Sequence, residues 1–337
     1  MRRFLLTGHV DHGKSTLGGQ LLYQCGAVGE RELKKTFDQA EQDQMYSFRY
    51  ARLLDIDSEE QDRGVTIESN EIEFSYKGDK FKLIDTPGHK LYIRYLIEAI
   101  YRNCSDGIAD DNNVVGVLVL SAVRRELEAA ISSGQVKEDI LLLRAIGINF
   151  LVVAVNKLDK FNMPSDASSA FKAAKSSLTP ILKLAKFKHV EYAACSGLEG
   201  AGIITPNPIF PHIPSLIDSI SKLSSESNLS LPSVHLRNSA SVNKFTAEIF
   251  ILNCDIFTAG YTGTLHSTKG EYTFTIETLN KITTSNTRAR QLPFIKTGDK
   301  GVVTIVLAEH VCLNNRDRII LRSRDSTIAY GIVLLNQ

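Results

Sequence analysis

The sequence lacks a long hydrophobic run, a paired cysteine motif and a large net charge. No apolar stretch approaches the roughly 20 residues that a membrane-spanning helix needs, and Met1-Arg2-Arg3 leads directly into the first apolar run, so we expect neither a membrane anchor nor a signal peptide. The five cysteines are odd in number and include no Cys-x-x-Cys pair, which argues against a disulfide framework or a zinc site. The formal net charge of +1 argues against a protein that coats DNA or RNA by bulk electrostatics. With 337 residues and 43% apolar content, the chain is predicted to be a soluble cytoplasmic protein of two or three domains.

A candidate phosphate-binding loop stands near the start. Gly-His-Val-Asp-His-Gly-Lys-Ser-Thr occupies residues 8–16, between the apolar run at residues 4–6 and a stretch compatible with a helix. The glycines let backbone N–H groups converge on a β-phosphate, while Lys14 would add charge between the β- and γ-phosphates and Ser15 would ligate Mg²⁺. Such a pattern arises by chance in on the order of one chain in a hundred of this length, so it needs support from elsewhere.

Two further polar motifs follow apolar runs typical of buried parallel strands. The first is Asp85-Thr86-Pro87-Gly88-His89, where Asp85 would hold Mg²⁺ through water and the Gly88 N–H would reach a γ-phosphate. The second is Asn156-Lys157-Leu158-Asp159, which directly follows the run at residues 150–155.

The second of these motifs predicts which base is bound. The Asp159 carboxylate can accept hydrogen bonds from the N1–H and the exocyclic amine of guanine, whereas adenine presents a lone pair at N1. This difference predicts selection of GTP over ATP by roughly 10⁴-fold. Lys157 would lie over the purine face, Asn156 would tie this loop to the phosphate loop, and the backbone amides of Ser196-Gly197-Leu198 would meet the guanine carbonyl oxygen. Asp159 alone would fit a helix N-cap equally well, but four motifs in this order favour a nucleotide site.

With these motifs, the chain resembles the translational GTPases. Residues 8–16 are similar to their phosphate loop, Arg63-Gly64-Val65-Thr66-Ile67 to their switch one, and Asp85 to His89 to their switch two. The fold predicted is an α/β P-loop GTPase domain, with a doubly wound and mostly parallel sheet, followed by a small antiparallel β-barrel.

The resemblance also assigns roles to individual residues. His89 would be the catalytic residue that places the attacking water, and Val10 and Val65 would form a hydrophobic gate in front of it. Thr66 would ligate Mg²⁺, and Asp11 would help to hold a monovalent cation. The predicted GTP- and GDP-binding residues are His9, Val10, Asp11, His12, Gly13, Lys14, Ser15, Thr16, Thr66, Gly88, Asn156, Lys157, Asp159, Ser196, Gly197 and Leu198. The predicted metal ligands are Ser15, Thr66 and, through water, Asp85.

The sequence pattern changes after a Ser- and Asn-rich segment. We predict a GTP-binding domain over residues 1–222, a linker over residues 223–241 and a β-barrel over residues 242–337. This last segment resembles the third domain of the elongation factor one alpha group, for example at Thr246-Ala247-Glu248-Ile249 and Ile295-Lys296-Thr297-Gly298-Asp299. The predicted strands are Phe245 to Leu252, Gly263 to His266, Tyr272 to Leu279, Lys300 to Leu307, Arg318 to Leu321 and Thr327 to Leu334.

The family places another barrel between these two parts, and this chain has no room for it. Ser15-Thr16-Leu17-Gly18-Gly19-Gln20 and Phe210-Pro211-His212-Ile213-Pro214 are more similar to eukaryotic release factor three and the Hbs-type rescue GTPases, whereas His12 is shared with elongation factor Tu. The resemblance therefore implies a translation termination or ribosome rescue factor, monomeric when free. Its partners would be the ribosome and a release-factor-like, tRNA-mimicking protein bound through the barrel, with no DNA or membrane partner. A tRNA-delivering elongation factor and a regulatory GTPase that no longer works on the ribosome stay open as alternatives.

Overall fold

The computed structural model describes residues 1–29, 31, 34, 36–38, 50–54, 70–86, 114–227, 239–281, 294–324 and 326–335. They form two compact units, one built mainly on residues 1–230 and the other mainly on residues 231–337. Within the described ranges, no helix combines the length and apolarity needed to cross a membrane.

The first unit is built on a six-stranded sheet with the strand order β2-β3-β1-β4-β5-β6. Its strands are β1 (Arg2–Thr7), β2 (Asn70–Tyr76), β3 (Asp79–Asp85), β4 (Val114–Ser121), β5 (Phe150–Asn156) and β6 (His189–Ala194). All neighbouring pairs are parallel except β2 and β3, which form an antiparallel hairpin at one edge. The central strands β4 and β5 are buried at every position, as their uninterrupted apolar sequences predict.

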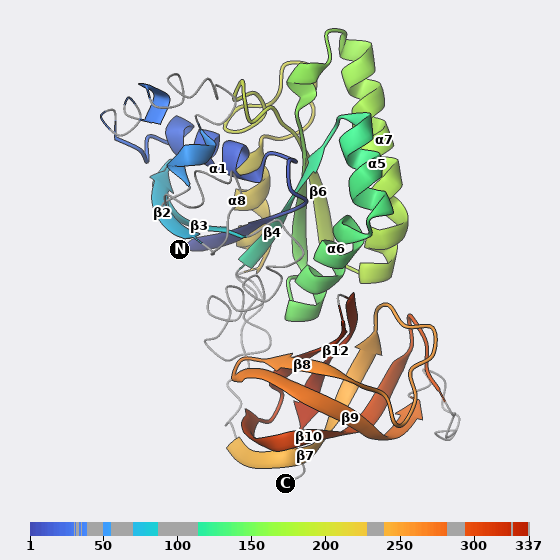
Figure 1. Ribbon diagram of the computed structural model, residues 1–337. Coiled ribbons are helices and arrows are strands. Elements are labelled where there is room, and N and C mark those ends of the chain that lie inside the picture. Colours follow the sequence, from blue (N-terminus) through green and yellow to red (C-terminus); the bar gives the residue numbers. More distant parts are fainter. Residues whose placement is uncertain are drawn as a thin grey trace. The chain divides into compact units, whose positions relative to one another are not determined.

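Helices cover both faces of this sheet. They are α1 (Lys14–Gln24), α5 (Arg124–Ser132), α6 (Gln135–Ile146), α7 (Pro164–Ala185) and α8 (Leu216–Ser227), with short 3₁₀ turns η2 (Ala51–Leu53) and η4 (Leu158–Lys160). Helices α1 and α8 share one apolar core with alternate residues of the strands, including Leu17, Leu21, Ile220 and Val117. Figure 1 shows α5 and α7 on the opposite side of the sheet from α1 and α8.

The second unit is a closed antiparallel barrel with the strand order β10-β7-β12-β11-β8-β9. Its strands are β7 (Ser239–Ile251), β8 (Thr262–Ser267), β9 (Gly270–Lys281), β10 (Lys300–Asn314), β11 (Arg318–Ser323) and β12 (Ser326–Leu334). The interior is filled by the inward side chains of these strands and of two of the segments that connect them, among them Phe245, Phe257, Phe274, Ile305 and Leu321. The fold class predicted from the sequence is therefore confirmed in both parts.

The predicted strand at Lys300 to Leu307 is too short. Strand β10 continues to Asn314, and its pairing with β7 changes register between Val306 and Val311. Residues 308–310 are exposed and polar or small, so the apolar alternation that marks a strand is interrupted there. The bulge carries the strand past this interruption, and the alternation resumes with buried Val311 and Leu313.

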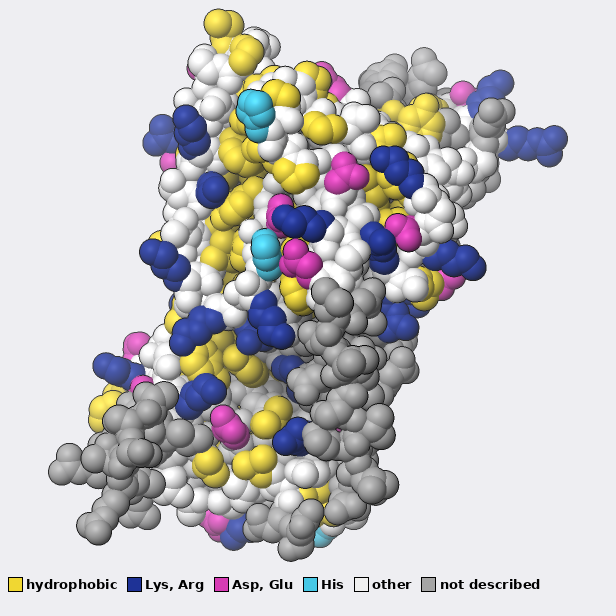
Figure 2. Space-filling view, turned by 180° about the vertical axis from the view of Figure 1, so that it is seen from behind, with side chains coloured by type: hydrophobic (Ala, Val, Ile, Leu, Met, Phe, Trp, Pro, Cys, Tyr) yellow, Lys and Arg dark blue, Asp and Glu magenta, His cyan; other side chains and the backbone are white. Residues whose placement is uncertain are grey.

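Charges of both signs are mixed on the surface. On the face shown in Figure 2, the described Lys and Arg side chains lie among Asp and Glu side chains. The described surface carries ion pairs such as Lys82 to Glu71 and Lys244 to Glu277, each with a closest N–O distance of 2.6 Å. This mixture of charges matches the small net charge of the chain.

Candidate functional site: a nucleotide site at the edge of the sheet

The loop at residues 8–13 connects β1 to α1 and gives the helix an open N-terminus. Gly13 precedes the first helical residue, Lys14, and adopts a left-handed conformation with φ of 84°. A Cβ atom there would lie 2.7 Å from the Asn156 Nδ2 atom, so the position is suited to glycine on both counts. The first-turn N–H groups of a helix have no partners within the helix, and they create a site that favours anions.

Lys14 lies at the base of this loop and faces carboxylates. Its side chain is buried, and its Nζ donates a hydrogen bond to the His9 backbone oxygen at 3.2 Å. Burial lowers the pKa of Lys14, and attraction to Asp85, Asp139 and Asp11 opposes that shift. Asp85 is the last residue of β3 and is fully buried. A cation and a carboxylate are therefore both held beneath the helix N-terminus, which fits a site for Mg²⁺ and phosphate.

Asn156 joins three loops of the site. It is the last residue of β5, and only 2% of it is exposed. Its amide nitrogen donates to the backbone oxygen of His12 at 3.0 Å, and its amide oxygen accepts a hydrogen bond from the Gly197 N–H at 2.8 Å. The phosphate loop, the Asn-Lys-x-Asp loop and the Ser-Gly-Leu loop are therefore held in one arrangement by a single side chain.

Asp159 and Ser196 lie together on the base-reading side. The Ser196 hydroxyl donates to Asp159 Oδ1 at 2.6 Å and accepts a hydrogen bond from the Glu199 N–H at 3.0 Å. The Ser196 hydroxyl thus holds the Asp159 carboxylate in one orientation. Leu198 lies in the same turn and is half-buried. A fixed carboxylate beside backbone N–H groups has the donor and acceptor pattern that guanine requires.

His12 is the one fully buried histidine of the described residues. Its Nδ1 lies 3.3 Å from the Val119 backbone oxygen, and its ring meets that of His9 edge to face at 5.4 Å. Burial lowers the pKa of His12 to about 4, and the neighbouring charges of His9 and Lys14 act in the same direction. His12 is therefore neutral at physiological pH, and it adds no charge to the phosphate loop.

The structure brings the described members of the predicted set to one edge of the sheet. The loop after β1 and the start of α1 carry His9, Val10, Asp11, His12, Gly13, Lys14, Ser15 and Thr16. The end of β5 and the two loops after β5 and β6 carry Asn156, Lys157, Asp159, Ser196, Gly197 and Leu198. The residue predicted to be catalytic, His89, lies outside the described residues, and so do the predicted switch residues Val65, Thr66 and Gly88. Their roles stay predictions, as do the metal ligation by Ser15 and Asp85 and the cation near Asp11.

The sequence reasoning missed a carboxylate at this site. Glu126, the third residue of α5, forms an ion pair with Lys157 in which Nζ and Oε2 are 2.8 Å apart. Its only sequence signal is an acidic residue in the first turn of the helix that follows a buried strand. A carboxylate in the first turn also stabilises any helix. The sequence alone could therefore not distinguish a residue that pairs with Lys157 from one that only stabilises α5.

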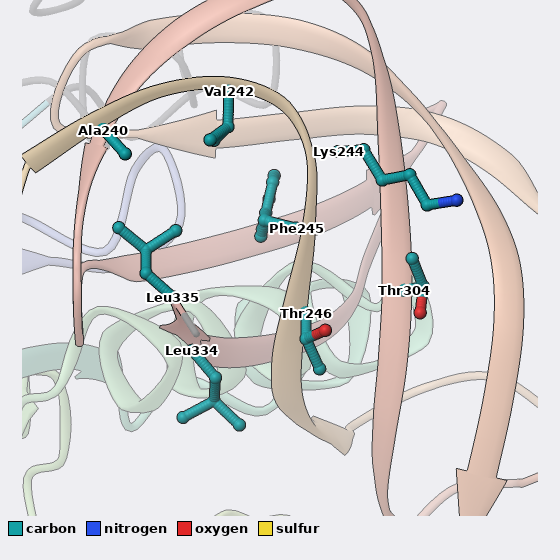
Figure 3. A pocket seen from close by; sticks show the side chains of 8 residues that line it. All are labelled: Ala240, Val242, Lys244, Phe245, Thr246, Thr304, Leu334 and Leu335. Atoms are coloured by element: carbon teal, nitrogen blue, oxygen red, sulfur yellow. The ribbon is translucent and has the colours of Figure 1, made fainter. Parts of the chain in front are cut away.

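The barrel carries a hollow of its own, of about 390 Å³. Figure 3 shows Ala240 and Val242 of β7 and Leu334 of β12 among its lining side chains, with Lys244 and Thr304 also contributing. None of its lining residues belongs to the nucleotide loops.

Comparison with known proteins places the chain in a family. Residues 1–226 match the elongation factor Tu GTP-binding domain, and residues 239–335 match the elongation factor Tu C-terminal domain. The chain belongs to the translational GTPases of the elongation factor Tu family. Only residues 227–238 separate the two matched segments, so the middle barrel of the family is lacking between them.

Relatives from two branches resemble this GTPase. Elongation factor 1-alpha of Hyperthermus butylicus is 35% identical over 221 residues, which cover 64% of this chain and 48% of the relative. Protein HBS1 of Drosophila melanogaster is 37% identical over 202 residues, which cover 59% of this chain and 28% of the relative. The chain thus spans about half or less of the length of these curated relatives.

A solved structure shares the fold. The GTPase-like domain of Ski7 from S. cerevisiae, bound to GDP and inorganic phosphate, aligns with a TM-score of 0.77 at 14% identity. The alignment covers 99% of this chain and 97% of the Ski7 domain. At this level of identity the likeness concerns the fold.

Proposed function

We propose that the chain binds GTP with Mg²⁺ and hydrolyses it to GDP and phosphate. The observation that carries this proposal is the Asn156 side chain, which joins the phosphate loop to both base-reading loops at 3.0 and 2.8 Å. Such a junction serves a ligand that has a phosphate group at one end and a base at the other. The set of motifs around it is that of a guanine nucleotide site.

The chain's own residues divide the work. Lys14 and the N–H groups at the start of α1 hold the phosphates, while Ser15 and, through water, Asp85 hold the metal. Mg²⁺ supplies charge neutralisation to the transferring phosphate when it is bound. By resemblance to the family, Thr66 would ligate Mg²⁺ and contact the γ-phosphate, and His89 would orient the attacking water behind the gate formed by Val10 and Val65. Phosphoryl transfer needs positioning and electrostatic stabilisation rather than covalent catalysis, so these groups suffice.

We further propose that this GTPase acts in the cytoplasm in translation termination or ribosome rescue, together with a release-factor-like partner held by the barrel. The similarity of its GTP-binding part to HBS1 supports this branch, as does the retention of the C-terminal barrel. Delivery of aminoacyl-tRNA is less favoured, because the family uses its middle barrel for the aminoacylated end of the tRNA.

A regulatory GTPase that no longer works on the ribosome is the second candidate. The short connection between the matched segments favours it, because the missing barrel also contributes to ribosome contact in the family. The two candidates differ in whether ribosomes stimulate GTP hydrolysis.

The test is the GTP hydrolysis rate of the purified chain, alone and with ribosomes, with and without a release-factor-like protein. For a translation factor we expect stimulation by several orders of magnitude, lost in His89→Ala while GTP affinity is kept. His212→Ala is the matched control, because His212 is exposed and remote from the nucleotide loops in sequence. A slow rate in every mixture, with tight GTP binding, would establish the regulatory candidate. Equal stimulation of His89→Ala and the parent chain would remove His89 from the mechanism.

A further inference from the structure

Glu126 lies beside the nucleotide loops, although it belongs to none of the nucleotide motifs. It is contributed by α5, and its Oε2 atom lies 2.8 Å from Nζ of Lys157, which is 31 residues away in the sequence. The side chains of Lys157 and Glu126 are only 24% and 33% exposed. The pair is therefore partly shielded from water, and salt screens it less than a pair on the open surface.

Several contacts keep the Glu126 carboxylate in its charged form. Burial opposes the charge, but hydrogen bonds from Lys157 and Ser121 outweigh it, and the pKa of Glu126 is lowered. Ser121 is the last residue of β4 and fully buried, and its hydroxyl also accepts a hydrogen bond from the Val123 N–H at 3.1 Å. Glu126 is thus fixed to the rigid end of a central strand.

The other end of the pair lies over the phosphate loop. Lys157 has a left-handed backbone with φ of 63°, which turns its side chain away from the path of β5. A Cβ atom at Gly13 would lie 3.9 Å from Cε of Lys157, so the aliphatic stem passes beside Gly13 with room for little more than a methyl group between them. A lysine side chain has four rotatable bonds, so an unpaired ammonium would sample many directions. Immobilising this side chain when a ligand binds would then cost conformational entropy.

We propose that Glu126 is a positioning residue of the nucleotide site, which holds the Lys157 stem stretched over the phosphate loop before the purine arrives. This inference rests on the proposed binding of guanine nucleotides. Glu126 then lengthens the lifetime of the bound nucleotide, because a Lys157 side chain that is already in place loses less conformational freedom on binding. A carboxylate that only stabilised α5 would act on the folding stability and leave that lifetime unchanged.

The experiment measures the dissociation rate of the fluorescent nucleotide N-methylanthraniloyl-GDP from the full chain. We expect Glu126→Ala to raise the rate by about two- to fivefold, the range for a partly exposed ion pair, and Glu126→Gln to raise it less because an amide oxygen still accepts from Lys157. In a Lys157→Ala background the Glu126→Ala substitution should have no further effect, since the partner is already gone.

Glu128→Gln is the matched control on the same helix. Glu128 pairs with Arg124 at 2.8 Å, but those side chains are 60% and 88% exposed, so its loss should leave the rate unchanged. An unchanged rate in Glu126→Ala, or the same increase in the presence and absence of Lys157, would overturn the positioning role. Glu126→Gln keeps the test decisive if the alanine variant fails to fold. A parent chain that binds no N-methylanthraniloyl-GDP would instead refute the proposed nucleotide binding itself.

Discussion

The buried histidine of the phosphate loop makes stability depend on pH in a calculable way. Because burial lowers the pKa of His12 from 6.5 to about 4, the unfolded chain binds this proton more tightly than the folded chain. The folded state therefore loses stability as pH falls through the window from 6.5 to 4, and it is unaffected by this group above pH 7. At pH 5 the loss amounts to about 2 kcal/mol, since the unfolded histidine is mostly protonated there and the folded one is mostly neutral.

The assay is urea unfolding at pH 7.5 and at pH 5, which gives the unfolding free energy at each pH. Pulsed hydrogen exchange, carried out at one common pH, reports whether strands β4 and β5 unfold in the same transition. His12→Asn has no titrating group at this position, so the difference in unfolding free energy between the two pH values should shrink by about 2 kcal/mol. The substitution lowers stability at both pH values, but that offset cancels in the difference. His212→Asn, at an exposed position, should leave the difference as it is in the parent chain. If His12→Asn loses as much stability on acidification as the parent chain, the histidine is not buried in its neutral form.

Two further substitutions test the geometry of the loop after β6. Gly202→Ala should destabilise the first unit by several kcal/mol, because φ is 78° and a Cβ atom would lie 1.8 Å from the Ala194 oxygen. Gly260→Ala is its control, with φ of 81° but open space around the site, and urea midpoints should show a cost of only about 1 kcal/mol there. Ser196→Ala removes the 2.6 Å hydrogen bond to Asp159, and GDP affinity measured by titration should fall about tenfold. An affinity equal to that of the parent chain would mean that Asp159 does not depend on this hydroxyl for its orientation.

Local patterns predicted most of the fold, because the nucleotide motifs directly follow buried strands. The run at residues 150–155 is apolar and β-branched, so it predicted both β5 and the position of Asn156 at its end. The barrel strands were predicted from their alternation, but two of them were predicted too short: β7 begins at Ser239 instead of Phe245, and exposed residues 308–310 mask the continuation of β10. A bulge depends on the pairing partner β7, which the strand's own sequence does not contain.

The contacts between loops could not be predicted in the same way. Asn156 and Gly197 are 41 residues apart, and Glu126 and Lys157 are 31 apart, so each pair meets only because the strands carry both partners to the same edge. Motifs identify the residues that contact a ligand in a family, and they omit a residue such as Glu126, which contacts one of those residues.

The closure of the barrel limits how a partner can bind to this part of the chain. Each of its six strands is hydrogen-bonded to a neighbour on both sides, so within the described residues an incoming peptide can pair only where one strand extends beyond a neighbour, as β7 does at residues 239–245 and β10 at residues 308–314. Over the rest of the described barrel, a partner can bind only the outward side chains or the connecting loops, where recognition depends on shape and chemistry instead of shared backbone hydrogen bonds. Single surface substitutions alter binding of this kind. The barrel can therefore change its partner during evolution without loss of its fold.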